Sequence, residues 1–154
     1  MNVLAARRHL RRFPACLGMV LLWLAGSAIA NDRPFEQYGN TKVYYSVFNS
    51  SFIRPEVASA YGLTRGRDRG LVSVSVVVDD LPVGRTAQVS GTATNLLSQQ
   101  QRLEFLEIRE GDAVYYLAPF RFDREDPLAF RVEVKTADQP ARTLNFNRKL
   151  YHDQ

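Results

Sequence analysis

A strict alternation of apolar and charged residues near the end of the chain most constrains what it can fold into. The apolar residues Leu128, Phe130, Val132 and Val134 alternate with Arg131, Glu133 and Lys135. Successive side chains of a β-strand point to opposite faces, so a period of two predicts a strand with one buried and one solvated face. The run 144–150 repeats this pattern. Together the two runs predict an antiparallel sheet that packs on one side only.

Two earlier runs predict strands in different positions. Between Val72 and Val78 the valines share a face opposite serines, which favours a central strand because β-branched residues pack well on a pleated surface. Between Thr86 and Thr94 the apolar face consists of small residues. Gly91 within that run predicts either a bulge or a close backbone contact.

The run 103–112 predicts an irregular strand followed by a hairpin turn. Leu103 and Ile108 cannot share a face in a regular strand, so we expect a bulge near Leu106 to absorb one residue. Glu110-Gly111-Asp112 then predicts a tight turn. The strand after that turn has a predicted inward face made of Val114, Tyr116, Ala118, Phe120 and Phe122. Pro119 predicts that this strand lies at an edge or at a bulge.

One segment breaks the β pattern. Pro55 suits the first turn of a helix, Val57 and Tyr61 share a helical face, and Gly62 is a natural stop. We therefore expect two turns of helix across an open edge or end of the sheets. The whole pattern predicts an all-β fold, an antiparallel immunoglobulin-like β-sandwich of about seven strands with one short helix; a small β-barrel is the alternative.

The first 30 residues have the layout of a secretory signal peptide. Four arginines make its charged end, namely Arg7, Arg8, Arg11 and Arg12. An apolar run from Leu17 to Ile29 follows, and small residues precede the expected cleavage site after Ala30. We therefore expect residues 1–30 to be removed and residues 31–154 to form a single periplasmic domain. An uncleaved membrane anchor at the apolar run is the alternative.

Removal of this segment changes the charge and the chemistry of the chain. The full sequence has 20 Lys plus Arg and 16 Asp plus Glu, but four arginines and no acid precede Asn31, which leaves a formally neutral domain. This balance argues against a nucleic-acid partner and against an anionic membrane surface. Cys16 and His9 are removed too, so disulfides, cysteine nucleophiles and zinc sites of Cys or paired His are excluded.

Four stretches carry a resemblance to a known family. They read YYSVFNSSFIRPEVASAYGLTRGRDRGLVSVSV, VSGTATNLL, LEFLEIREGDAVYYLAPFRF and FNRKLY. They resemble exported proteins of Gram-negative bacteria grouped as domain of unknown function family 4426, and the resemblance covers nearly all of Phe35 to Tyr151. It implies a periplasmic β domain and implies no activity, because no motif of the family has an established catalytic role.

The arginine-rich loop 65–70 is the sharpest local candidate for a binding site. Arg65, Arg67 and Arg69 alternate with flexible or acidic residues, and three guanidinium groups could clasp a carboxylate or a phosphate. The alternative is a solvated loop whose charges pair with Asp68 and nearby acids. Convergence of Arg65 and Arg69 on one pocket would favour the first interpretation.

Two pairs of adjacent tyrosines form the second candidate. In regular strands one member of each pair must face away from the core. Outward tyrosines can recognise a partner because they bury a large area at low entropy cost. We therefore assign Tyr45 and Tyr115 to a possible interaction surface, and a role in the core or in cross-strand packing is the alternative.

Metal binding and catalysis have little support in the sequence. The acids near Glu104 and Asp112 lack the spacing of a dedicated calcium loop. After the signal peptide the only histidine is His152, close to the chain end. We therefore expect no metal, no cofactor and no catalytic residue.

These observations order the functional hypotheses. The first is a non-catalytic binding or protein-interaction module of the periplasm that recognises an envelope protein or a peptide. The second is a small-ligand or anion-binding domain that uses the loop Arg65–Arg69. An enzyme is the third. Protein recognition predicts an exposed apolar patch or an unpaired edge strand, whereas ligand binding predicts a concave pocket that ends in arginines.

Overall fold

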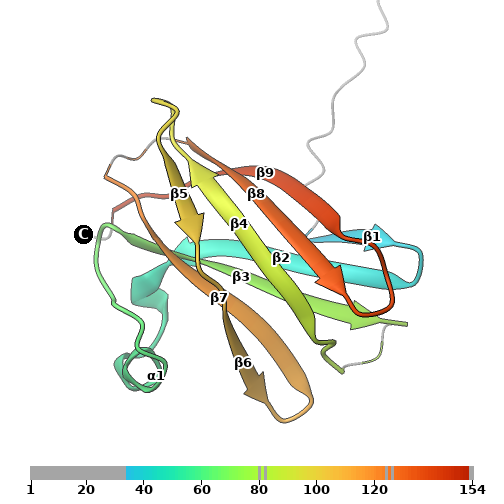
Figure 1. Cartoon of the computed structure of the whole chain (residues 1–154). Helices are drawn as coiled ribbons and strands as arrows, with labels where there is room; N and C mark the ends of the chain where they lie inside the picture. Colours follow the sequence, from blue (N-terminus) through green and yellow to red (C-terminus); the bar gives the residue numbers. More distant parts are fainter. Residues whose placement is uncertain (1–33, 80, 82, 124, 126, 153–154) are drawn as a thin grey trace, which may run out of the picture. The chain divides into compact units, whose positions relative to one another are not determined.

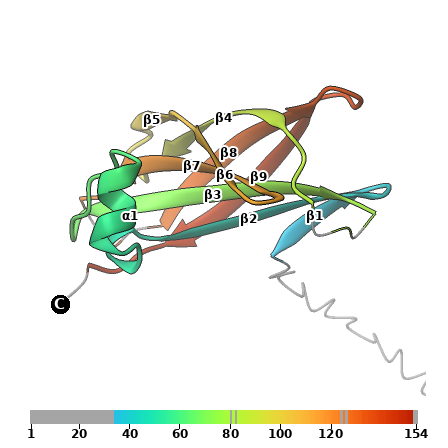
Figure 2. The same ribbon diagram turned by 90° about the horizontal axis from the view of Figure 1, so that it is seen from below.

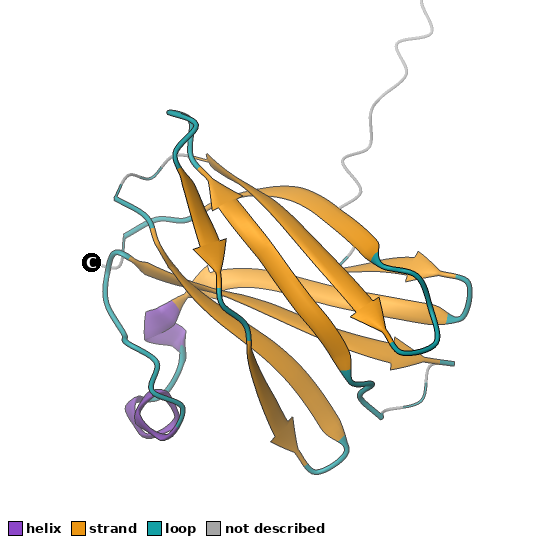
Figure 3. Ribbon diagram, viewed as in Figure 1, coloured by secondary structure: helices purple, strands orange, loops and turns teal. Residues whose placement is uncertain are grey.

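A computed structural model describes residues 34–79, 81, 83–123, 125 and 127–152. The predicted signal peptide lies outside the described residues. These residues form two antiparallel sheets with one short helix, as Figures 1 and 3 show. The structure is therefore a β-sandwich, as predicted, and its described strands do not close into a barrel.

The described residues contain nine strands, where the sequence predicted about seven. The first sheet has the order β1-β2-β3-β7-β6, and the second has the order β5-β4-β8-β9. The strands are β1 (Phe35–Tyr38), β2 (Thr41–Asn49), β3 (Arg69–Val78), β4 (Ala87–Thr94), β5 (Gln100–Leu103), β6 (Leu106–Glu110), β7 (Ala113–Arg121), β8 (Pro127–Thr136) and β9 (Arg142–Lys149). One additional strand is β1, which forms a hairpin with β2 through Gly39, a residue with a φ of 63°.

The core lies between the two sheets and follows the predicted alternation. The first sheet contributes alternate residues of β3 and β7, and the second contributes alternate residues of β8. The buried side chains include Val72, Val74, Val76, Val114, Tyr116, Ala118, Phe120, Phe122, Leu128, Phe130, Val132, Val134 and Leu144. The valine-rich strand β3 is central in its sheet, as predicted. Gly91 makes a close backbone contact with β8 rather than a bulge.

The predicted bulge near Leu106 is a change of sheet. Leu103 ends β5, which pairs with β4 in the second sheet, whereas Leu106 begins β6, which pairs with β7 in the first. The chain therefore leaves one sheet and joins the other at Glu104 and Phe105. This crossing explains why Leu103 and Ile108 are out of phase although both are buried.

Pro119 lies in a part of β7 that pairs with a neighbouring strand on one side only. The pairing of β6 with β7 stops at Leu117, so Pro119 pairs only with Leu71 of β3. The missing backbone N–H of proline therefore costs no hydrogen bond to a second neighbouring strand. The prediction of an edge position is confirmed for this stretch of the strand.

The helical segment joins β2 to β3. It consists of a short 3₁₀ turn, η1 (Ser50–Phe52), and a helix, α1 (Pro55–Ala60), as predicted between Pro55 and Gly62. Gly62 has a φ of 65°, and the next residue, Leu63, donates its backbone N–H to the carbonyl of Ala58. Figure 2 shows α1 at one end of the sandwich. Within the described ranges, neither helix is long and apolar enough to cross a bilayer.

Candidate functional site

Several loops meet at one end of the sandwich, which we call the loop end. It comprises the segment 50–68, the β4–β5 loop 95–99, the described residues of 122–127 and the tail 150–152 (Figures 1 and 2). Among the described residues, the four most exposed large apolar side chains all lie there: Phe52 (77%), Leu96 (67%), Leu97 (65%) and Tyr151 (59%). Two of these residues, Leu96 and Leu97, are adjacent in one loop and line one hollow, and exposed apolar side chains that lie together indicate an interaction site.

The β4–β5 loop is braced from within by Asn95. Its side-chain oxygen accepts the backbone N–H groups of Leu97 (3.0 Å) and Gln99 (2.9 Å), and its amide donates to the side chain of Gln99 (2.7 Å). Its backbone N–H donates to the carbonyl of Gln99, and Ser98 takes a positive φ of 61°. The loop therefore holds Leu96 and Leu97 out of the core in a defined conformation.

A hollow of about 850 Å³ lies beside this loop, and we call it the loop-end hollow. Its size is within the range of small-molecule sites. It is lined by apolar and polar residues from three places: Asn95, Leu96, Leu97, Gln99, Gln101, Arg121, Phe122, Asp123 and Leu128. One side of the hollow is apolar, and another side carries an arginine and an aspartate.

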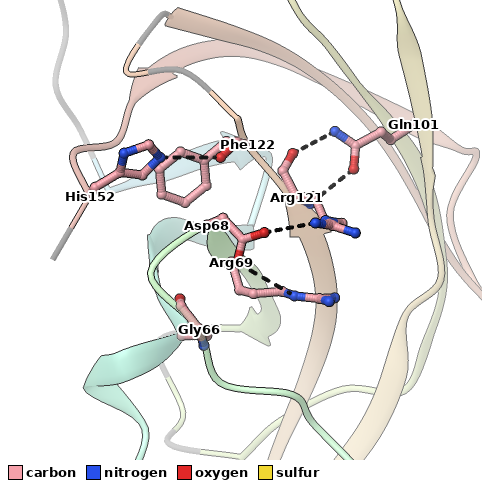
Figure 4. Close-up of polar contacts among 8 residues, drawn as sticks. Gly66, Asp68, Arg69, Gln101, Arg121, Phe122 and His152 are labelled. Atoms are coloured by element: carbon pink, nitrogen blue, oxygen red, sulfur yellow. Dashed lines mark hydrogen bonds and ion pairs between the residues drawn. The ribbon is translucent and has the colours of Figure 1, made fainter.

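The end of β7 forms a fixed wall of the hollow. Gln101 donates to the carbonyl of Arg121 (2.6 Å) and accepts its backbone N–H (2.9 Å), so one side-chain amide occupies the open edge of β7. The backbone N–H of Phe122 donates to the carbonyl of Asp68, and the ring of His152 stacks on the Phe122 ring (Figure 4). Because these partners come from three other segments, the backbone of this wall is held from several sides.

The three arginines of the sequence-predicted anion site do not converge. The Arg65 guanidinium donates to the carbonyl of Ser51 (3.0 Å), and Arg69 lies 3.9 Å from the Asp68 carboxylate. Arg67 is exposed. None of the three lines the hollow; the guanidinium there belongs to Arg121, which pairs with Asp68 at 2.9 Å. Of the three, only Arg69 faces an acid among the described residues, so the second interpretation, a solvated loop whose charges pair with acids, holds for one of the three arginines.

The ion pair of Asp68 predicts a dependence of stability on pH. The hydrogen bond from Arg121 holds the pKa of Asp68 below its ordinary value. A carboxylate with a lowered folded-state pKa stabilises the fold above its unfolded-state pKa, and that contribution is lost as the pH falls through the folded-state pKa. We expect urea unfolding midpoints to fall less for Asp68→Asn than for the wild type between about pH 7 and about pH 2. An equal fall in both proteins would contradict this.

The structure separates the two tyrosine pairs. Tyr45 faces the core and stacks on Phe146 with ring centroids 4.5 Å apart, which corrects its assignment to an outward surface. The outward member of that pair is Tyr44, which contacts Phe35. The outward member of the second pair is Tyr115, which is exposed as expected.

Tyr116 is a buried core residue whose hydroxyl links two strands. Its hydroxyl donates to Glu107 (2.7 Å) and accepts the backbone N–H of Ala87 (2.8 Å), so it joins β6 to the start of β4. Burial raises the pKa of Tyr116, whereas the hydrogen bonds from Tyr116 and Arg109 lower the pKa of Glu107. Glu107 thus serves the fold and does not join a cluster of acids.

The described residues hold no group of three or more His, Cys, Asp or Glu side chains that could bind a metal ion together. His152 contacts the ring and carbonyl of Phe122, and its backbone N–H donates to Glu125. These contacts hold His152 against the end of β7 although it lies close to the chain end.

Sequence reasoning missed four residues of this candidate site, namely Leu96, Leu97, Gln101 and Arg121. The signal that could have found them was an adjacent apolar pair, Leu96 and Leu97, between the turn-forming residues Asn95 and Ser98. Two leucines in a short hairpin loop belong to no buried strand face, so their presence indicates another role.

Comparison with known proteins identifies the family. The family model described as domain of unknown function (DUF4426) matches residues 35–153. A DUF4426 family protein from Pseudomonas aeruginosa PAO1 is 37% identical, with a TM-score of 0.70 over 78% of this chain and 95% of that chain.

Two more distant structures share the fold alone. FetP of uropathogenic E. coli strain F11, recombinantly expressed in the periplasm of E. coli, is 9% identical, with a TM-score of 0.56 over 78% of this chain and 94% of that chain. A copper-bound variant of FetP is 8% identical, with a TM-score of 0.53 over 77% and 93% of the two chains. No curated protein matches the sequence. By its family match and by its likeness to the Pseudomonas protein, this chain belongs to the DUF4426 family.

Proposed function

We propose that this protein is an exported, non-catalytic binding module of the periplasm that recognises an envelope protein or peptide through its loop end. The observation that carries the proposal is the Asn95-braced loop, which presents Leu96 and Leu97 beside a hollow with a fixed wall. The signal-peptide layout of residues 1–30 supports export.

The energetics favour a protein or peptide partner. Burial of one leucine side chain contributes roughly 1.5–3 kcal/mol, and an ordered loop loses little conformational entropy on binding. Arg121, which lines the same hollow, is of a residue type that is enriched at protein interfaces. An apolar patch with an arginine at its side is therefore better suited to a polypeptide than to a small inorganic anion.

Two other functions have less support. An anion site in the loop Arg65–Arg69 would need converging guanidinium groups, and Arg65 and Arg69 contact different partners. Copper binding, which is known for FetP, would need a set of ligands that the described residues of this chain do not bring together. We therefore propose neither.

Site-specific photocrosslinking in intact cells tests the proposal. A photoreactive residue replaces Leu97 in one strain and Lys135, an exposed residue on the outer face of the second sheet, in a control strain. We expect a discrete adduct from position 97 and none from position 135. The substitution Leu96→Ser should lower the adduct yield about tenfold, since it removes roughly 1.4 kcal/mol or more of binding free energy. Equal labelling at both positions would contradict the proposal.

A further inference from the structure

Arg121 places hydrogen-bond donors on the wall of the loop-end hollow. Its side chain is 60% exposed, and among the described residues it forms one ion pair, between its Nη2 and Asp68 Oδ2. The Asp68 carboxylate also faces Arg69, so one negative charge serves two guanidinium groups. A guanidinium has five N–H donors, and the fork geometry suits a second carboxylate. The cluster therefore has both the charge and the donors to bind an anionic group.

The backbone that carries Arg121 is held by two other segments. Gln101 binds both backbone groups of Arg121, and the carbonyl of Asp68 accepts the N–H of the next residue. The ion pair with Asp68 directs the guanidinium itself, at 2.9 Å.

The remaining lining of the hollow determines which chemical groups the ligand must carry beside its anionic group. Leu96, Leu97 and Leu128 supply an apolar wall, which requires an apolar group close to the carboxylate. Asp123 lies on the same hollow, and an ionised carboxylate accepts hydrogen bonds only. A ligand with N–H donors next to its apolar group can satisfy Asp123, whereas a fatty acid cannot.

We propose that the loop-end hollow binds the free C-terminus of a polypeptide whose last side chain is apolar. The terminal carboxylate lies at Arg121, the last side chain lies against Leu96 and Leu97, and a backbone N–H faces Asp123. This inference rests on the proposed function and names the chemical class of its partner. Terminal carboxylates are a recurrent target of peptide-binding modules.

Titration with short peptides tests the inference on the domain 31–154, produced by export and processing of the full chain. The probes are the tripeptide Ala-Ala-Leu as free acid, the same peptide as C-terminal amide, and decanoate. Binding is followed by NMR shifts of the backbone amides of Arg121 and Phe122. We expect the free acid to bind at least about tenfold more tightly than the amide, because the amide has no charge for the guanidinium.

Three variants separate a binding role from a structural one. Arg121→Gln should abolish the preference for the free acid, whereas Arg131→Gln, on the outer face of the second sheet, should retain it. Asp68→Asn should tighten binding of the free acid, since it removes the competing carboxylate from Arg121. Loss of a structural ion pair alone would not produce that gain.

Several outcomes would overturn the inference. These are equal affinities for the acid and the amide, unchanged binding in Arg121→Gln, or decanoate binding as tight as that of the peptide. The crosslink at position 97 reports on the proposed function independently. If that crosslink persists while acid and amide bind equally, the interaction role stands and the terminal-carboxylate partner is wrong.

Discussion

Replacing Phe130 with alanine is expected to lower the free energy of unfolding by about 3–5 kcal/mol, the usual cost of such a truncation in a core. Phe130 is 2% exposed on β8. Its ring lies 5.2 Å from the ring of Phe120, which comes from the opposite sheet, and 5.2 Å from that of Phe146. The alanine variant loses the transfer free energy of the ring and leaves a cavity between the sheets. Since domains are stable by only about 5–15 kcal/mol, this is a large part of the total.

The matched control is Phe52→Ala, which truncates the same side chain at the loop end. Phe52 is 77% exposed, so the change should alter stability by no more than about 0.5 kcal/mol. Urea unfolding at neutral pH, followed by tyrosine fluorescence, measures both variants. Equal losses in the two variants would mean that the buried contacts between the sheets do not carry the stability of the sandwich.

The strands that alternate cleanly were predictable because burial of one face imposes a period of two. In β8 the alternation covers the whole strand, and the structure buries Leu128 and Val134 as the pattern predicted. The helix α1 was predictable for a similar reason, since Pro55 and Gly62 mark its ends locally. Each of these signals lies within one element.

The sequence carries no comparable local signal for which strands pair with each other. The phase change between Leu103 and Ile108 was visible, but a bulge and a change of sheet shift the phase in the same way. Only the partners, β4 for one strand and β7 for the other, distinguish the two. The orientation of Tyr45 was ambiguous for the same reason, because register decides which member of an adjacent pair faces the core.

The candidate site depends on contacts between distant segments. Asp68 and Arg121 are 53 positions apart, and Gln101 reaches Arg121 across 20 positions. Sequence reasoning therefore favoured the local cluster of arginines in the loop 65–70, none of which lines the hollow. The hollow is lined by the β4–β5 loop, by Gln101 of β5 and by the end of β7, and no one of these segments shows it alone.

Gly91→Ala is expected to destabilise the fold by about 1–3 kcal/mol, as overpacking in a tight site does. Gly91 lies within β4, which pairs with β5 on one side and β8 on the other. A Cβ atom there would lie 2.7 Å from the carbonyl oxygen of Arg131 and 3.2 Å from the Cα atom of Val132. Both atoms belong to the backbone of β8, so relief requires a shift of the strand itself. The close pairing of β4 with β8 therefore requires a residue without a side chain at position 91.

Gly66→Ala is the control that isolates this effect. A Cβ atom at Gly66 would also approach its neighbours closely, at 2.9 Å from Arg69 Cγ and 3.1 Å from Asp68 Oδ1, but both are side-chain atoms, which can move without a shift of the backbone. Both substitutions reduce the entropy of the unfolded chain by a similar amount, about 0.4–1 kcal/mol, so that contribution cancels in the comparison. Thermal unfolding of the two variants should show a lower Tm for Gly91→Ala alone. Equal Tm values would mean that β4 and β8 can separate at Gly91 without cost, and that the close contact between them does not hold the second sheet together.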